Sequence, residues 1–173
     1  MWVRGDRRET GRLEKERAII KGNVLGLALW IAASLAAGWF GSQFMPGEWY
    51  ASLAKPAWTP PNAVFGPVWT VLYVLMGVAA WLVWRKAGFS GAAGALSLFI
   101  VQLALNALWS YLFFGAQEPL WAFIEILVLL AVIVATMVRF FQIVPAAGGL
   151  LVPYVCWVAF ASALNFQLWR LNA

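Results

Sequence analysis

The sequence contains no histidine and a single cysteine, Cys156, so it lacks most of the side chains on which metalloproteins and hydrolases depend. Histidine is the commonest metal ligand and the usual general base, so neither a catalytic triad nor a histidine-ligated haem can be assembled. One cysteine forms no disulfide within the chain and provides no thiolate cluster for zinc. A Walker loop, a Gly-x-Gly-x-x-Gly fingerprint and an EF-hand pattern are missing as well. We therefore expect no metal site, no cofactor and no conventional catalytic site.

Charged residues are also scarce. Only 11% of the 173 residues are charged, whereas 64% are hydrophobic, and the mean hydropathy is +0.80. A soluble domain of this size could not bury so much apolar surface, and one membrane span needs about 20 apolar residues. The sequence thus predicts an all-α integral membrane protein with a bundle of five transmembrane helices. The net charge of +5 is concentrated at the N-terminus, which indicates membrane topology rather than a surface for nucleic acid.

Turn-forming residues divide the hydrophobic sequence into five runs. A charged N-terminal tail is expected over residues 1–21, solvated or interfacial, and helical from Thr10 onward. Residues 22–173 are expected to form one membrane domain. Its helices are predicted at about 23–44, 63–84, 92–114, 119–141 and 150–169, with a lid-like loop over residues 45–62.

The lid-like loop is rich in proline and aromatic residues. Pro56, Pro60 and Pro61 in the loop, and Pro67 shortly after it, fix φ along the chain, which makes this stretch stiff. With its tryptophan and tyrosine rings, it offers a rigid aromatic surface that suits a lid over a flat apolar ligand. The alternative is an ordinary interfacial belt, because tryptophan and tyrosine collect at membrane surfaces in any case.

Polar side chains interrupt two of the predicted helices. Gln102, Asn106, Trp109 and Phe113 share one face of the third helix, and amides in hydrocarbon need partners, so this stripe should face protein or a cavity. Either a bond between helices or a contact with a ligand would satisfy it. Glu125, about two turns into the fourth helix, is a functional candidate because carboxylates inside a membrane are costly. The milder alternative is that it reaches the headgroups or stays protonated.

Small residues recur at four-residue spacing on two helices, which allows the backbones of neighbouring helices to approach closely. On the first helix this indicates either a packing seam or the ordinary tolerance of glycine in membranes; the residues are Gly22, Gly26, Ser34, Gly38 and Ser42. On the third helix the same spacing predicts a homodimer packed partly through this helix; the residues are Gly91, Ala93, Ala95 and Ser97.

The basic residues predict the orientation in the membrane, because cytoplasmic segments carry an excess of lysine and arginine. Five helices place the two termini on opposite sides. One side holds the basic residues of the tail together with Arg85, Lys86 and Arg139, ten in all, and the other holds only Lys55 and Arg170. The N-terminus is therefore expected inside, and the C-terminus and the lid-like loop outside, in a bacterial membrane.

Four motifs, in this order, resemble those of the translocator protein family, also known as tryptophan-rich sensory proteins or peripheral-type benzodiazepine receptors. They are Trp-Tyr-x-x-Leu-x-Lys-Pro-x-Trp-x-Pro-Pro at 49–61, Phe-x-x-Val-Trp-Thr-x-Leu-Tyr at 65–73, Gln-Leu-x-Leu-Asn-x-x-Trp-Ser at 102–110, and Pro-Tyr-x-x-Trp-x-x-Phe-Ala-x-x-Leu-Asn at 153–165. The resemblance extends from about Gly38 to Asn172 and covers all five helices.

This resemblance implies a five-helix bundle, usually a homodimer, with a ligand pocket beneath the first loop. It implies a membrane receptor or transport regulator that binds porphyrins such as protoporphyrin IX, and related flat apolar ligands. The pocket residues that it implies are Tyr50, Pro60, Phe65, Trp69, Tyr73, Asn106, Trp109, Phe113, Trp157, Ala161 and Leu164. The cholesterol motif of animal members is incomplete, because Phe166 stands where those members have tyrosine.

Two other functions stay open at this point. Some family members are reported to degrade porphyrin in light, and Trp69 and Trp157 would then be the candidate catalytic residues beside the excited ring. The third possibility is a structural membrane protein without a specific ligand, in which the aromatic residues only anchor the bundle.

Overall fold

The computed structural model describes residues 4–44 and 47–173, and helices are the only regular elements in these two ranges. In chain order they are α1 (Arg4–Gly41), α2 (Glu48–Ser52), α3 (Asn62–Gly91), α4 (Ala93–Ser110), the π-helix η1 (Tyr111–Gly115), α5 (Pro119–Ile143), α6 (Pro145–Leu150) and α7 (Val152–Asn172). Five segments of the described chain are long and apolar enough to cross a membrane: Ile20–Gly41, Asn62–Gly91, Ala93–Gly115, Pro119–Ile143 and Pro145–Asn172. The predicted fold class is confirmed, and the chain is a multi-pass membrane protein.

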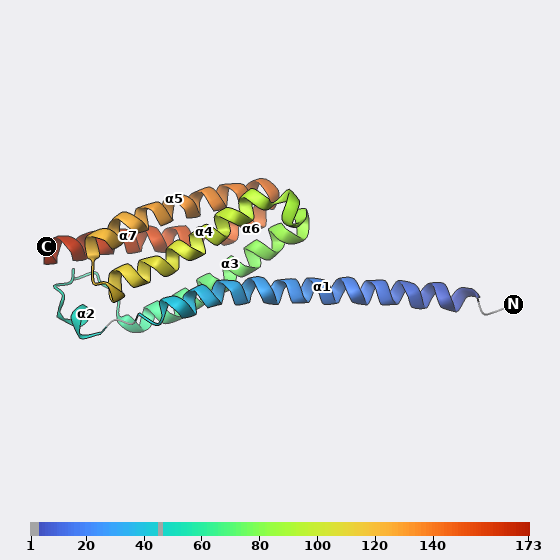
Figure 1. The fold of residues 1–173 in the computed structure, drawn as a ribbon, viewed down its shortest axis with the longest axis horizontal. Helices are drawn as coiled ribbons and strands as arrows, with labels where there is room; N and C mark the ends of the chain where they lie inside the picture. The colour runs from blue at the N-terminus through green and yellow to red at the C-terminus, as the bar shows by residue number, and fades with distance from the viewer. Residues whose placement is uncertain (1–3, 45–46) are drawn as a thin grey trace.

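The five crossing segments form one bundle with two distinct ends (Figure 1). The loop end carries α2 and the C-terminus, whereas the tail end carries the α3–α4 turn and α6, and α1 continues outward from it. Arg85, Lys86 and Arg139 lie near the last turns of α3 and α5, hence at the tail end, and Lys55 and Arg170 lie at the loop end. The basic residues are thus grouped as the sequence indicated, and which end faces the inside stays a prediction.

The N-terminal tail is not a separate segment, because α1 runs as one helix of 38 residues from Arg4 to Gly41. The expected helix start at Thr10 was too late, and the expected boundary at residue 22 does not interrupt the helix. Arginine, lysine and glutamate are good helix formers, and the tail contains no proline to break the helix. Residues 1–3 of the predicted tail and residues 45–46 of the lid-like loop lie outside the described residues.

The other helices begin and end within a few residues of the predicted positions, and the differences have local causes. α3 extends to Gly91, but its helical geometry is interrupted at Gly88, where φ is 68° and a side chain would be strained. The predicted third helix ends in the wider turn of η1, and the predicted fifth helix consists of α6 and α7 and continues to Asn172. The lid-like loop contains one short helix, α2.

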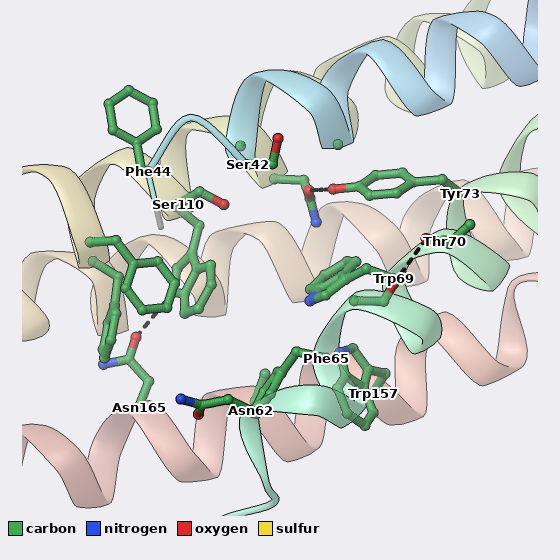
Figure 2. Close-up of a pocket in the computed structure, with 18 of the residues that line it drawn as sticks. Ser42, Phe44, Asn62, Phe65, Trp69, Thr70, Tyr73, Ser110, Trp157 and Asn165 are labelled. Atoms are coloured by element: carbon green, nitrogen blue, oxygen red, sulfur yellow. Dashed lines mark hydrogen bonds between the residues drawn. The ribbon is translucent and has the colours of Figure 1, made fainter. Parts of the chain in front are cut away.

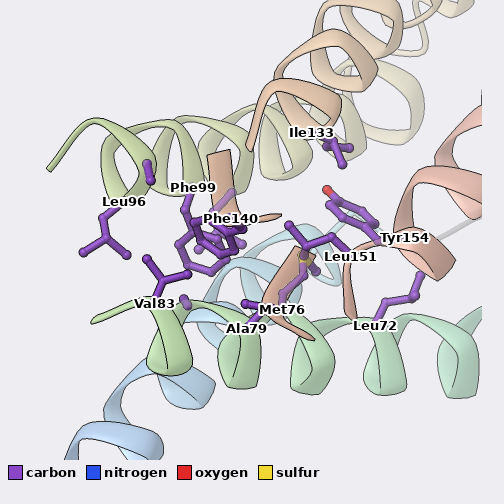
Figure 3. Close-up of a cluster of buried hydrophobic side chains, with 14 of the residues drawn as sticks. Leu72, Met76, Ala79, Val83, Leu96, Phe99, Ile133, Phe140, Leu151 and Tyr154 are labelled. Atoms are coloured by element: carbon purple, nitrogen blue, oxygen red, sulfur yellow. The ribbon is translucent and has the colours of Figure 1, made fainter. Parts of the chain in front are cut away.

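The tail half of the bundle is a closely packed hydrophobic core (Figure 3). Met76, Ala79, Ala80 and Val83 form a stripe along α3 in which every side chain is fully buried. Opposite this stripe, Phe99 of α4 stacks on a ring of α5, with centroids 5.9 Å apart. Small side chains on α3 therefore bring the other helices close to its backbone.

Glycine allows α1 to pack directly against α3. A Cβ on Gly77 would lie 2.6 Å from the Cα atom of Ile31, so no other residue fits without moving the two helices apart. Gly26 and Gly38 of α1 receive the rings of Trp84 and Tyr73 in the same way. The interpretation of the small residues on α1 as a packing seam is confirmed at these positions, whereas Gly22 has no neighbour within 4 Å.

Candidate ligand-binding cavity

The loop half of the bundle encloses a cavity of about 370 Å³ between α1, α3, α4 and α7 (Figure 2). Ten of the eleven pocket residues that the family resemblance implied line it: Tyr50, Phe65, Trp69, Tyr73, Asn106, Trp109, Phe113, Trp157, Ala161 and Leu164. Pro60 does not line it. This proline precedes Pro61, the N-cap residue of α3, and so it belongs to the stiff segment that leads into α3.

One wall of the cavity is built from aromatic rings on α3 and α7. Trp69 and Tyr73 are four residues apart on α3, so they share a face, and their rings stack with centroids 5.6 Å apart. Tyr154 of α7 meets Trp69 edge-on at 6.1 Å. Phe65 meets Trp157 edge-on at 5.8 Å, so the two helices are joined by ring contacts. These flat faces are held in place by their neighbours before any ligand arrives.

A second aromatic group lies where α4 passes into η1. Trp109 and Phe113 stack with centroids 5.3 Å apart. The π-helical turn, in which the Ala116 N–H donates to the Tyr111 carbonyl at 2.7 Å, widens the helix at this point. π-helical turns are frequent at functional sites. Tyr50 of α2 meets the Phe113 ring at 6.2 Å, so the lid-like loop docks on this turn.

The floor of the cavity is a chain of buried hydrogen bonds. The Tyr73 hydroxyl donates to Asn106 Oδ1, and Asn106 Nδ2 donates to the Tyr154 hydroxyl at 3.2 Å. Tyr154 in turn donates to Gln102 Oε1 at 2.9 Å. The prediction that the amides of the third helix face protein or a cavity is confirmed, and these bonds between helices account for most of their polar atoms. Asn106 also lines the cavity, so a contact with a ligand stays a prediction for this residue.

Trp109 is positioned by a further buried amide. Its Nε1 donates to Asn165 Oδ1 at 3.0 Å, and Asn165 Nδ2 donates to the Pro119 carbonyl at 2.9 Å. Asn165 thus joins α4, α5 and α7 at the level of the cavity. By contrast, the Nε1 atom of Trp157 is buried without a hydrogen-bond partner in the described structure.

The sequence reasoning assigned no residue of α1 to the pocket, yet α1 closes one side of it. Its lining residues are Leu35, Gly38, Trp39, Gly41, Ser42 and Phe44. The available signal was the spacing of small residues on this helix, because Gly38 and Gly41 let α1 approach Tyr73 and Ser110. Four polar residues of the other helices were also absent from the implied set: Asn62, Thr70, Ser110 and Asn165.

The lid-like loop is fastened to the C-terminal end of α7. The Ala54 N–H donates to Asn172 Oδ1 at 2.9 Å, and Asn172 Nδ2 donates to the Ala54 carbonyl at 3.0 Å. Lys55 is held within the loop: its Nζ donates to the carbonyls of Ala51 and Leu53 and lies 4.7 Å from the centre of the Tyr50 ring. Burial raises the pKa of Tyr50, so its hydroxyl keeps its proton at neutral pH.

The sequence profile of the TspO/MBR family matches residues 28–170, which is most of the chain and includes every residue of the cavity. The chain belongs to the TspO/MBR family. The match begins at residue 28, so the charged N-terminal part of α1 lies outside it.

Named proteins of this family are similar over most of their length. The chain is 44% identical to the Translocator protein of Homo sapiens over 137 residues, which cover 76% of this chain and 81% of that one. It is 45% identical to the Tryptophan-rich protein TspO of Chlorobaculum tepidum over 156 residues, 86% of this chain and 97% of that one. The Tryptophan-rich sensory protein of Cereibacter sphaeroides is 42% identical over 142 residues, 82% of this chain and 88% of that one. This protein is therefore a TspO-family membrane protein.

Proposed function

We propose that this protein binds porphyrins, such as protoporphyrin IX, and related flat apolar ligands in the cavity beneath the lid-like loop, and acts as a membrane receptor or transport regulator. One observation carries the proposal. The loop half of the bundle encloses a preformed, mainly apolar cavity whose walls are the faces of Trp69, Trp109 and Trp157. Its volume of about 370 Å³ falls within the range of small-molecule sites, which is about 300–1,000 Å³.

The distribution of polar groups indicates how such a ligand would lie. Ser42, Asn62 and Ser110 line the cavity near its loop end, because α1 ends, α3 begins and α4 ends there. The deeper part is lined by the stacked rings of Trp69 and Tyr73. A porphyrin would therefore place its apolar ring inside and its carboxylates toward the loop end. Because the volume of the cavity is near the lower limit of this range, a porphyrin would also occupy the opening of the cavity.

Two further parts of the proposal concern assembly and orientation. A homodimer through α4 would use Ala93 and Ser97, which are exposed, whereas Ala95 is only 5% exposed and packs within the protomer. The sequence had included Ala95 in this seam; its burial leaves the outer face of α4 for a second copy. The excess of basic residues at the tail end supports a cytoplasmic N-terminus in a bacterial membrane.

A second candidate function is light-dependent degradation of the bound porphyrin. The supporting observation is that Trp69 and Trp157 line the same cavity from two helices, so a bound ring would lie between them. The chemistry would belong to the excited porphyrin, and the protein would hold oxidisable rings beside it. Illumination of wild type and of Trp69→Phe/Trp157→Phe, at matched occupancy, distinguishes the two functions. A defined product formed only by wild type would establish degradation, and identical bleaching would leave a binder.

Binding itself is tested by titrating detergent-solubilised protein with protoporphyrin IX and following tryptophan fluorescence. Saturable quenching is expected, and Trp69→Ala should weaken binding about tenfold, since stacking contributes about 0.5–1.5 kcal/mol beyond area burial. Trp121→Ala is the matched control, because Trp121 is 60% exposed on α5 and away from the cavity. Equal effects of the two variants would place the ligand elsewhere, and an absence of saturable quenching would favour the structural role.

A further inference from the structure

The exposed residues that line the cavity all come from the same two helices. On α1 and directly after it they are Leu35, Trp39 and Ser42, and on α3 they are Asn62, Gly66 and Thr70. The lining residues on α4, η1 and α7 are buried or half-buried. Figure 2 shows Ser42 on the α1 side of the cavity and Asn62 and Thr70 on its α3 side. The cavity therefore opens to the outside of the bundle between α1 and α3.

On α3 the exposed residues continue a face that packs on α1 further along the helix. They follow one another at four-residue spacing, and Tyr73 and Gly77 extend the same face toward the tail end. The Tyr73 ring fills the space where a side chain on Gly38 would lie, and Gly77 lies against the backbone of Ile31. The two helices are thus in contact as far as Tyr73 and separate beyond it. This separation leaves a slot along the first turns of α3.

At its loop end, α1 packs on α4 and η1 instead of α3. A Cβ on Gly41 would lie 2.9 Å from the Oγ atom of Ser110, and the Phe44 ring meets the Tyr111 ring edge-on at 5.3 Å. The lid-like loop is fastened to η1 and α7. These contacts close the cavity toward the loop end and toward α4, and they leave the slot between α1 and α3 open.

The slot lies in the membrane-crossing part of the chain. Leu35 and Trp39 belong to the crossing segment Ile20–Gly41, and the slot residues of α3 begin the segment Asn62–Gly91. From Asn62 to Thr70 the helix rises about 12 Å, which is close to the thickness of about 15 Å that one leaflet contributes to the hydrocarbon core. The slot therefore faces the acyl chains of the loop-side leaflet.

The polar groups of the slot are arranged as an amphiphile requires. Ser42 and Asn62 lie at its loop end, next to the headgroup region. Deeper in the slot, the Thr70 hydroxyl donates to the Gly66 carbonyl at 2.9 Å, so it needs no partner from an occupant. Behind it, the cavity presents the stacked aromatic rings of α3. An occupant of the slot is thus expected to be polar at the loop end and apolar inside.

We propose that a lipid of the loop-side leaflet inserts one acyl chain through this slot into the cavity and keeps its headgroup beside Ser42 and Asn62. An empty cavity of about 370 Å³ would leave its lining atoms without van der Waals partners. Water is a poor substitute, because a buried water needs about two to four polar partners and the inner wall is aromatic. Acyl chains are the apolar groups available on the open side. This site goes beyond the proposed function, because it requires no porphyrin.

The lipid site is tested with the full chain in nanodiscs that contain phosphatidylcholine with a photoactivatable diazirine group on one acyl chain, and no porphyrin. Light attaches the chain to the residues that it touches, and mass spectrometry identifies them. Wild type should be labelled at Tyr73, which is 7% exposed and lines the cavity, so that only a chain inside reaches it. Tyr111, 46% exposed and outside the cavity, reports the lipids that surround the bundle. Label on Tyr111 with none on Tyr73 would overturn the proposal.

A blocked slot should exclude the chain. Gly66→Leu should lose the label on Tyr73 and keep the label on Tyr111, because a Cβ on Gly66 has nothing within 4 Å and the leucine side chain can extend into the slot. Gly22→Leu is the matched control: it also has free space, lies away from the cavity, and should follow wild type.

Thr70→Leu, on the same stripe of α3, is a second blocking variant that decides the outcome if Gly66→Leu does not fold. Persistent label on Tyr73 in a folded blocked variant would refute the slot as the route of the chain. The outcome is independent of porphyrin binding, so a failure of the proposed function would leave the lipid site to be decided by the labelling alone.

Discussion

The two halves of the bundle are built from the same helices, yet α3 is packed closely against its neighbours in the tail half, whereas in the loop half it lines an apolar cavity. Along α3, the tail half contributes Met76, Ala79 and Ala80, which are fully buried against the neighbouring helices. The loop half contributes Phe65 and Trp69, whose rings pack against rings on α7 and leave a cavity between the helices. Small residues let backbones meet, whereas large rings braced in pairs hold them apart. Residue size along α3 therefore accounts for the position of the aromatic cavity.

Replacing an alanine by leucine should lower stability in the tail half and ligand affinity in the loop half, and this is the largest expected effect. Ala79→Leu adds three carbon atoms at a fully buried position, so we expect a loss of more than about 3 kcal/mol of stability, or no folded protein. Ala161→Leu fills part of the cavity instead, so thermal stability should hardly change while affinity for protoporphyrin IX falls at least about tenfold. Thermal unfolding and ligand titration measure both. Similar losses of stability would show that the loop half is not hollow.

A smaller change compares two glycines of α3. Gly77→Ala should destabilise the protein by about 1–3 kcal/mol, because its Cβ would meet the backbone of Ile31 in the tail half. Gly66→Ala in the loop half has nothing within 4 Å, so the gain in helix propensity should leave stability equal or slightly higher. Unfolding midpoints in detergent measure the difference. A stable Gly77→Ala protein would mean that α1 and α3 can separate without cost.

Asn165 tests whether hydrogen bonds help to keep the loop half open. Asn165→Ala leaves the buried Trp109 N–H without its acceptor and removes one donor from the Pro119 carbonyl, which should cost about 1–2 kcal/mol. The Trp109 ring should then become mobile, visible as a changed tryptophan emission, and ligand affinity should fall. Ser162→Ala is a suitable control, because its hydroxyl bonds only within its own helix. If the two variants behave alike, the ring contacts alone hold Trp109.

The smallest expected effect concerns the loop above the cavity. Asn172→Ala removes both bonds to Ala54, so ligand should leave about two- to tenfold faster while stability stays nearly constant. Stopped-flow fluorescence measures the dissociation rate. Leu171→Ala, at the neighbouring exposed position, should leave the rate unchanged. An unchanged rate in Asn172→Ala would mean that the ligand leaves by another route.

The sequence predicted the helices well because each crossing is a long apolar run bounded by proline, glycine or charge. It also predicted the buried stripe of Gln102 and Asn106, since an amide in hydrocarbon must find a partner. The pocket residues on α3, α4 and α7 came from motifs shared with a family rather than from periodicity. Those on α1 were missed, because α1 carries no such motif and the role of Gly38 appears only once Tyr73 lies against it.

The π-helical turn and the packing of Ala95 could not be predicted from the sequence either. The π-helical turn at Tyr111–Gly115 depends on how Phe113 and Phe114 pack, and no spacing in the sequence signals one extra residue in a turn. Ala95 was assigned to a dimer seam because small residues look alike from the sequence, whether they face a second copy or a helix of the same protomer. Because Ala95 is only 5% exposed, it packs against a helix of the same protomer.

The unbroken α1 helix has a practical consequence for imaging. Between Arg4 and Ile20 it is continuous with the membrane span, and at 1.5 Å per residue this stretch extends about 24 Å beyond the bundle. A helical marker protein fused in register at this point would inherit the direction of α1 without a flexible joint. A membrane protein of 19.1 kDa is otherwise too small and too featureless to align in electron micrographs. A marker fused to this charged stretch would therefore allow the orientation of each particle to be determined.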